Sequence, residues 1–161
     1  MKPFLYIFLI IFVVSCSNSD DVDQMEDTIA KDFTVEKFTG NKIAYKYNDN
    51  VSLGVPKTKL ITSFNNFSRE LGLDKKALSV EILEVEKEYY IRFYNEDKSV
   101  STVALLPVEN SKNDQHIFSI GKTTCHSTAC SNCCGCLPKG DYCTKCEVDY
   151  KDCERTTTSG E

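Results

Sequence analysis

The sequence predicts an α+β protein, in which one helix packs on a small antiparallel β-meander and a disulfide-rich irregular C-terminal tail follows. Apolar residues recur at helical spacing in one stretch, several later segments alternate with period two, and eight of the nine cysteines fall within the last 37 residues. The expected organisation is a leader over 1–15, an acidic tether over 16–31, a domain over 32–124 and a cysteine-rich tail over 125–161.

The helix is expected between Pro56 and Gly72. Pro56 and Thr58 suit the beginning of a helix, and glycine commonly ends one. The apolar residues are spaced for a single helical face and comprise Leu60, Ile61, Phe64, Phe67 and Leu71. Because such a stripe usually covers a core, we expect it to pack on the sheet.

Strands are predicted where β-rich or alternating residues are separated by short polar turns, which favour antiparallel hairpins. The four segments of the meander are 80–85, 89–94, 100–106 and 117–120, and a further strand is expected at 42–47. The sequence leaves open whether Val22, Met25, Ile29 and Phe33 form a short helix or belong to the tether.

One face of the second meander strand carries Tyr90, Arg92 and Tyr94. Tyrosine and arginine are enriched at binding hot spots, so this face is a candidate contact surface that is open to solvent. Cross-strand packing would account for the same tyrosines without any partner.

The N-terminus has the features of an export signal. Lys2 precedes an uninterrupted run of 11 apolar residues, 4–14, whereas a membrane-spanning helix needs about 20. The run ends in Val13-Val14-Ser15-Cys16, which resembles the lipobox of bacterial lipoproteins. The resemblance implies cleavage before Cys16 and lipidation of this residue, so that the chain is anchored to a membrane without spanning it. The alternative is an ordinary secretory signal followed by a chance cysteine.

The segment after Cys16 is acidic, with five carboxylates before the first base, Lys31. Its beginning, Ser17-Asn-Ser-Asp-Asp21, looks like the signal that sends lipoproteins of the Bacteroidota to the cell surface. This likeness implies an outer-membrane protein that faces the exterior, although a solvated tether would have the same composition. Asp27-Thr28-Ile29 also resembles the O-glycosylation motif of those bacteria, with Thr28 as the acceptor.

The tail contains too little apolar surface to offset its ordering entropy, so cross-links are expected to hold it together. Its cysteines are Cys125, Cys130, Cys133, Cys134, Cys136, Cys143, Cys146 and Cys153. For an exported chain we expect four disulfides, with Cys133 and Cys134 bonded to different partners. Two Cys-x-x-Cys pairs, 130/133 and 143/146, with His126 nearby, leave a zinc-binding tail as an alternative. A redox dithiol is disfavoured, because the thioredoxin-like frame is absent.

The tail is similar to one that ends many small lipoproteins of the Bacteroidota. The similarity rests on Cys130-x2-Cys133-Cys134, the turn Pro138-Lys-Gly-Asp141 and the closing segment from Cys153. No activity is assigned to this group, so the resemblance implies no catalytic residue.

The composition and motifs disfavour several classes of function. A net charge of −5 gives no long-range attraction to nucleic acid. We expect no enzyme and no cofactor, because the sequence lacks phosphate loops, dinucleotide fingerprints and nucleophile elbows, although the cluster Glu81, Glu84, Glu86 and Glu88 leaves a two-carboxylate hydrolase open. The prediction is a binding or adhesion module, with a protein or glycan partner and a lipid anchor. An inhibitor of a secreted enzyme and an envelope structural protein are the alternatives.

Overall fold

The computed structural model describes residues 19–108, 116–132, 135–149 and 151–158. In this part of the chain the elements are α1 (Ser19–Asp32), β1 (Lys42–Tyr47), β2 (Asn50–Leu53), α2 (Lys57–Glu70), β3 (Ala77–Val85), β4 (Glu88–Asn95), β5 (Val100–Pro107), β6 (His116–Ser127), β7 (Pro138–Lys139), β8 (Tyr142–Cys143) and β9 (Glu154–Thr157). The predicted α+β class is therefore confirmed. No helix in these described ranges is both long enough and apolar enough to cross a bilayer.

The main sheet is larger than the predicted small meander. Strands β3 to β6 pair antiparallel in chain order, as expected, but the full order is β2-β1-β6-β5-β4-β3, and β9 also pairs with β6. The long strand β6 makes this possible, because its first part pairs with β1 and its last part with β9 along the same edge. The outer strands β2 and β3 approach one another, so the sheet curls towards a barrel.

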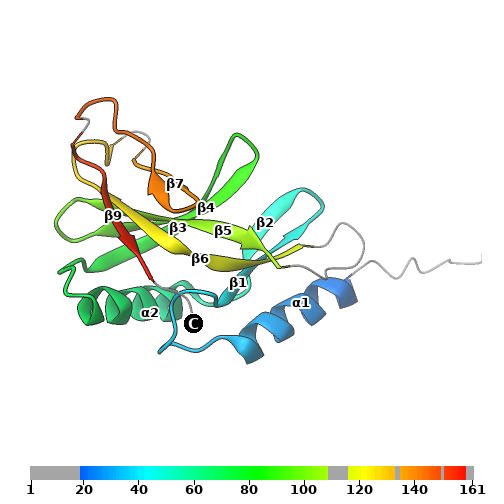
Figure 1. Ribbon diagram of the computed structural model, residues 1–161. Coiled ribbons are helices and arrows are strands. Elements are labelled where there is room, and N and C mark those ends of the chain that lie inside the picture. Colours follow the sequence, from blue (N-terminus) through cyan, green and yellow to red (C-terminus); the bar gives the residue numbers. More distant parts are fainter. Residues whose placement is uncertain (1–18, 109–115, 133–134, 150, 159–161) are drawn as a thin grey trace, which may run out of the picture.

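Helix α2 packs on one face of the sheet through its aromatic residues, as the sequence predicts (Figure 1). Phe64 is fully buried and stacks on Phe93 of β4, with 4.2 Å between the ring centroids. Phe38, from the segment between α1 and β1, packs edge-on against Phe64 at 5.5 Å. Leu71 was assigned to the same stripe, but it follows the last helical residue and is 44% exposed.

Residues 19–32 form a second helix, α1, where the sequence predicted a tether and left a short helix open. Met25 and Ile29 of α1 are buried in the core. Tyr45 of β1 donates a hydrogen bond to the Glu26 carboxylate at 2.6 Å, and this bond together with burial raises the pKa of Tyr45 to about 12. Gly54 allows the close approach, because a Cβ there would lie 2.7 Å from Cδ1 of Ile29. Helix α1 is therefore part of the domain.

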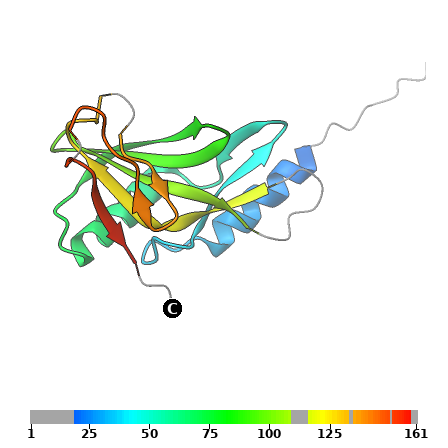
Figure 2. The same cartoon turned by 45° about the horizontal axis from the view of Figure 1, so that its top comes forward.

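The C-terminal segment is only partly irregular, which corrects the prediction. Strand β6 runs through the expected boundary between residues 124 and 125, and Cys125 pairs with Thr102 of β5 on one side and with Arg155 of β9 on the other. Residues 135–149 lie on the face of the sheet opposite the helices (Figures 1 and 2). The last part of the chain therefore completes the sheet and covers its second face.

Three disulfides hold this segment: Cys125–Cys143, Cys130–Cys146 and Cys136–Cys153. The predicted use of cysteines as cross-links is confirmed for these six. Cys133 and Cys134 lie outside the described residues. The expectation that these two cysteines bond to different partners therefore stays a prediction.

The Asp152 carboxylate fixes the turn after β6. It accepts hydrogen bonds from the Ser127 hydroxyl and from the backbone N–H groups of Thr128, Ala129 and Cys130. Burial raises the pKa of Asp152, but the hydrogen bonds outweigh this effect and hold the pKa below its usual value. Asp152 adjoins Cys153, so the carboxylate holds this part of the chain to the turn after β6, and the third disulfide joins it to Cys136.

Candidate binding groove

The predicted contact surface on β4 is covered by the C-terminal segment. Tyr90 is 1% exposed and Arg92 is 4% exposed, while Tyr94 is half-buried and donates a hydrogen bond to Glu81. Gly135 has φ +60° and packs on the guanidinium, where an added Cβ would lie 2.8 Å from Nη2 of Arg92. The expectation of an open face is therefore wrong, because sequence periodicity does not show what the tail covers.

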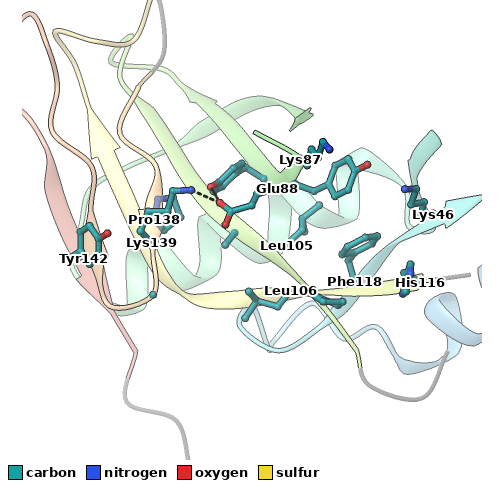
Figure 3. Close-up of a pocket in the computed structure, with 15 residues that line it drawn as sticks. Lys46, Lys87, Glu88, Leu105, Leu106, His116, Phe118, Pro138, Lys139 and Tyr142 are labelled. Atoms are coloured by element: carbon teal, nitrogen blue, oxygen red, sulfur yellow. Dashed lines mark hydrogen bonds and ion pairs between the residues drawn. The ribbon is translucent and has the colours of Figure 1, made fainter. Parts of the chain in front are cut away.

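A cavity of about 610 Å³ remains between this cover and the sheet. The β7–β8 hairpin contributes one wall, and the ends of β4, β5 and β6 contribute the floor. Figure 3 shows Pro138 and Tyr142 at one end of this groove, Leu105 and Leu106 in the middle, and Lys46 at the other end. Clefts of this volume are typical of sites for small molecules or short chain segments.

The floor of the groove is apolar and partly open to solvent. Leu106 on β5 is 49% exposed and Tyr142 on β8 is 57% exposed, although both are large and apolar or aromatic. Towards the Lys46 end, Tyr89 and Phe118 form an edge-on aromatic pair with 5.4 Å between ring centroids. Exposed apolar side chains gathered in a concavity are typical of ligand-binding sites.

One end of the groove holds a closed ionic cluster. The Glu88 carboxylate accepts hydrogen bonds from Lys139 and from the Tyr90 hydroxyl, and Figure 3 shows Lys139 directed at Glu88. The bond from Lys139, followed by that from Tyr90, lowers the pKa of Glu88. The same contacts raise the pKa of Lys139, first through Glu88. Burial is the main cause that raises the pKa of Tyr90. The charges at this end therefore neutralise one another.

At the other end of the groove, a lysine forms an ion pair with a solvent-exposed carboxylate. Lys46 lies opposite His116 in the β1–β6 ladder, and its Nζ is 6.0 Å from the centroid of the Tyr89 ring. The carboxylate that Lys46 contacts, at 3.2 Å, belongs to Asp49, whose side chain is 97% exposed. The hydrogen bond to Asp49 raises the pKa of Lys46, so the side chain is a cation.

The turn at the rim of the groove has an unfavourable backbone. Glu86 and Lys87 join β3 to β4 with φ +53° and +67°, which are the values of a type I′ turn. Asparagine and glycine fit these positions with little strain, whereas glutamate and lysine do so at a cost of about 1 kcal/mol or more each. Lys87 lines the groove, so strain is retained at this rim.

A buried serine–histidine pair lies away from the groove. His126 Nδ1 is 2.8 Å from Ser101 Oγ, and its Nε2 is 3.4 Å from Thr156 Oγ1 on β9. Asn95 donates to the same serine at 2.8 Å. Ser101 is 0% exposed and His126 is 2% exposed, so no substrate reaches the pair. Its structural effect is to hold β9 and the β4–β5 connection to β6.

The other sequence candidates are not brought to the groove. Cys16 lies outside the described residues. Thr28 lies on the exposed side of α1, where its hydroxyl donates to the Gln24 carbonyl at 2.8 Å, and its glycosylation stays a prediction. Of the carboxylate cluster, Glu81 bonds to Tyr94 and Glu88 to Lys139.

The alternative of a zinc-binding tail is not supported, because most of the cysteines that it requires form disulfides. Cys130, Cys143 and Cys146 each belong to a disulfide, and a disulfide sulfur is not a thiolate ligand. Within the described ranges, no group of three or more His, Cys, Asp or Glu side chains is arranged to hold a metal ion.

Sequence reasoning missed most of the groove, although one signal was present. In Leu105-Leu106-Pro107 the alternation of β5 breaks, so that apolar residues face both sides of the strand. No such signal exists for Lys46, Phe118 and Tyr142, because separate strands bring them together. No family model, no curated protein and no solved structure matches this chain.

Proposed function

We propose that this protein is a non-catalytic binding module, carried on the outer membrane by a lipid on Cys16 and facing the exterior. The exposed apolar groove between the β7–β8 hairpin and β4 to β6 is the observation that carries the binding role. Exposed leucine and tyrosine in a concave site are costly to leave in water, and a ligand that covers them recovers this free energy. The partner is a chain-like ligand or an extended segment of a protein or glycan, since the groove is too small for a folded domain.

The membrane anchor is supported by Val13-Val14-Ser15-Cys16 after the apolar run. We expect Cys16→Ala to release the protein from membranes into the soluble fraction. The two or three acyl chains on Cys16 would bind a bilayer firmly, and the variant cannot carry them. Metabolic labelling with a palmitate analogue, followed by fractionation, measures both effects. If the wild-type chain takes up no label, the proposed lipid anchor is wrong, whereas the proposed binding role of the groove is not affected by this result.

The groove is tested with a neutral apolar probe, N-phenyl-1-naphthylamine, whose fluorescence rises in apolar surroundings. We expect the probe to bind the wild type, and Leu106→Glu to weaken binding at least tenfold, since the carboxylate would be desolvated beside the probe. Leu106 is 49% exposed, so the substitution leaves the core intact.

Leu78→Glu is the matched control, because Leu78 lies on β3 outside the groove and is 60% exposed. This variant is expected to bind the probe like the wild type. Equal loss in both variants, or no probe binding by the wild type, would refute the groove as the binding site.

A further inference from the structure

We propose that the ligand of the groove is an amphipathic carboxylate, whose apolar part lies on the exposed Leu106 side chain and whose carboxylate meets Lys46 beside His116. This inference rests on the binding role proposed above and specifies its ligand. The apolar floor and the basic end line the same cavity, and Figure 3 shows Leu106 between the hairpin and Lys46.

The charges of the groove favour an anion. Among the residues that the structure describes, its lining contains Lys46, Lys87 and Lys139 but one carboxylate, Glu88, although the whole chain has a net charge of −5. Glu88 is occupied by Lys139 and the Tyr90 hydroxyl. The positive charge available to a ligand therefore lies at the Lys46 end, and a cationic ligand would meet lysines on several sides.

Lys46 can exchange its present carboxylate for that of a ligand. Its partner Asp49 is 97% exposed and sits at 3.2 Å, and an ion pair of this kind contributes about 0–1 kcal/mol. The Lys46 side chain itself is only 25% exposed, so a carboxylate brought by an apolar ligand would be partly desolvated and interact more strongly. The Tyr89 ring, 6.0 Å from Nζ, keeps the ammonium at the groove.

The dimensions also suit a single chain or ring. A cavity of about 610 Å³ holds a small amphiphile, whereas a folded partner would contact only its rim. Because the lining is mixed, a purely apolar ligand would make no ionic contact with Lys46, and a purely ionic ligand would leave Leu106 exposed.

The experiment compares decanoate with 1-decanol, which have the same chain length and differ in charge, by calorimetry or by displacement of the naphthylamine probe. We expect decanoate to bind about tenfold more tightly, and this preference to shrink at high salt. Lys46→Ala is expected to remove the preference, by weakening the binding of decanoate far more than that of decanol. Lys59→Ala, on the exposed surface of α2, is the matched control and should keep the preference.

Asp49→Asn tests whether Lys46 binds the ligand carboxylate directly or only maintains the local structure. Asparagine accepts the left-handed backbone at this position, φ +65°, and removes the carboxylate that competes for Lys46. We expect decanoate to bind about two- to fivefold more tightly to this variant, with no change for decanol.

Each outcome has a distinct meaning. If decanoate and decanol bind the wild type equally, or if Lys46→Ala keeps the preference, the ligand class is wrong while the binding groove stands. If neither compound nor the neutral probe binds, the proposed function fails together with the inference.

Discussion

Replacing Cys125 and Cys143 together with serine is expected to lower the free energy of unfolding by about 3 kcal/mol. The bridge closes a loop with a sequence separation of 18, and the entropy of such a loop in the unfolded chain gives a loss of this size. Cys125 is fully buried in β6 and Cys143 lies in β8, so the same change frees the hairpin from the sheet. Because the hairpin forms a wall of the groove, binding of the neutral probe should also be lost.

The measurement is urea unfolding followed by circular dichroism, in a chain whose Cys133 and Cys134 are also serine so that thiol exchange is prevented. Replacing Cys130 and Cys146 is the matched control, since their sequence separation of 16 predicts a similar loss of stability. Neither residue lies in the hairpin, so probe binding should decline less. A loss below about 1 kcal/mol for the first pair would show that the sheet does not depend on the cross-link.

Acidification from pH 6.5 to about 4 is expected to destabilise the protein through His126. Burial lowers the pKa of His126 to about 4 from the usual 6.5, with Glu154 opposing the shift and Lys75 supporting it. Above pH 6.5 the histidine is neutral in both states. Below this pH the unfolded chain binds a proton first, so stability falls until the folded protein also binds one, by about 3 kcal/mol in total.

Thermal or urea unfolding at half-unit steps of pH measures this slope. We expect His126→Asn to flatten it between pH 6.5 and 4, because the amide retains polar contact with Ser101 and does not titrate. His116→Asn, at an exposed position, should keep the slope. A slope that survives in His126→Asn would assign the acid sensitivity to other groups.

Carboxylates add a second loss of stability, which begins at the acidic end of the histidine range. Burial raises the pKa of Asp97, but hydrogen bonds from Lys75 and Ser99 outweigh it and hold the pKa at about 2. Asp97 therefore contributes stability above its usual pKa of 3.8, and this contribution is lost as the pH falls towards 2. Because the pKa of Glu88 is also lowered from its usual 4.5, carboxylates contribute to the loss of stability below about pH 5, and the difference between the wild type and His126→Asn isolates the histidine effect.

The sequence by itself determined the elements whose periodicity is local. The apolar stripe of α2, with Phe64 and Phe67 on one face, shows its helical spacing within 14 residues, and the alternation of β4 does the same for a strand. The use of the tail cysteines as cross-links also followed from composition, because the segment has too few apolar residues to fold by burial.

Only the tertiary structure decided which surfaces face solvent. Tyr90 and Arg92 lie on the polar-looking face of β4 but are covered by the tail, since the three disulfides place that segment on the sheet. The groove arises in the same way, because Lys46, Leu106 and Tyr142 come from three strands that the sheet topology and a disulfide bring together. Local periodicity reports one strand at a time, whereas burial and concavity depend on contacts between residues that are distant in the chain.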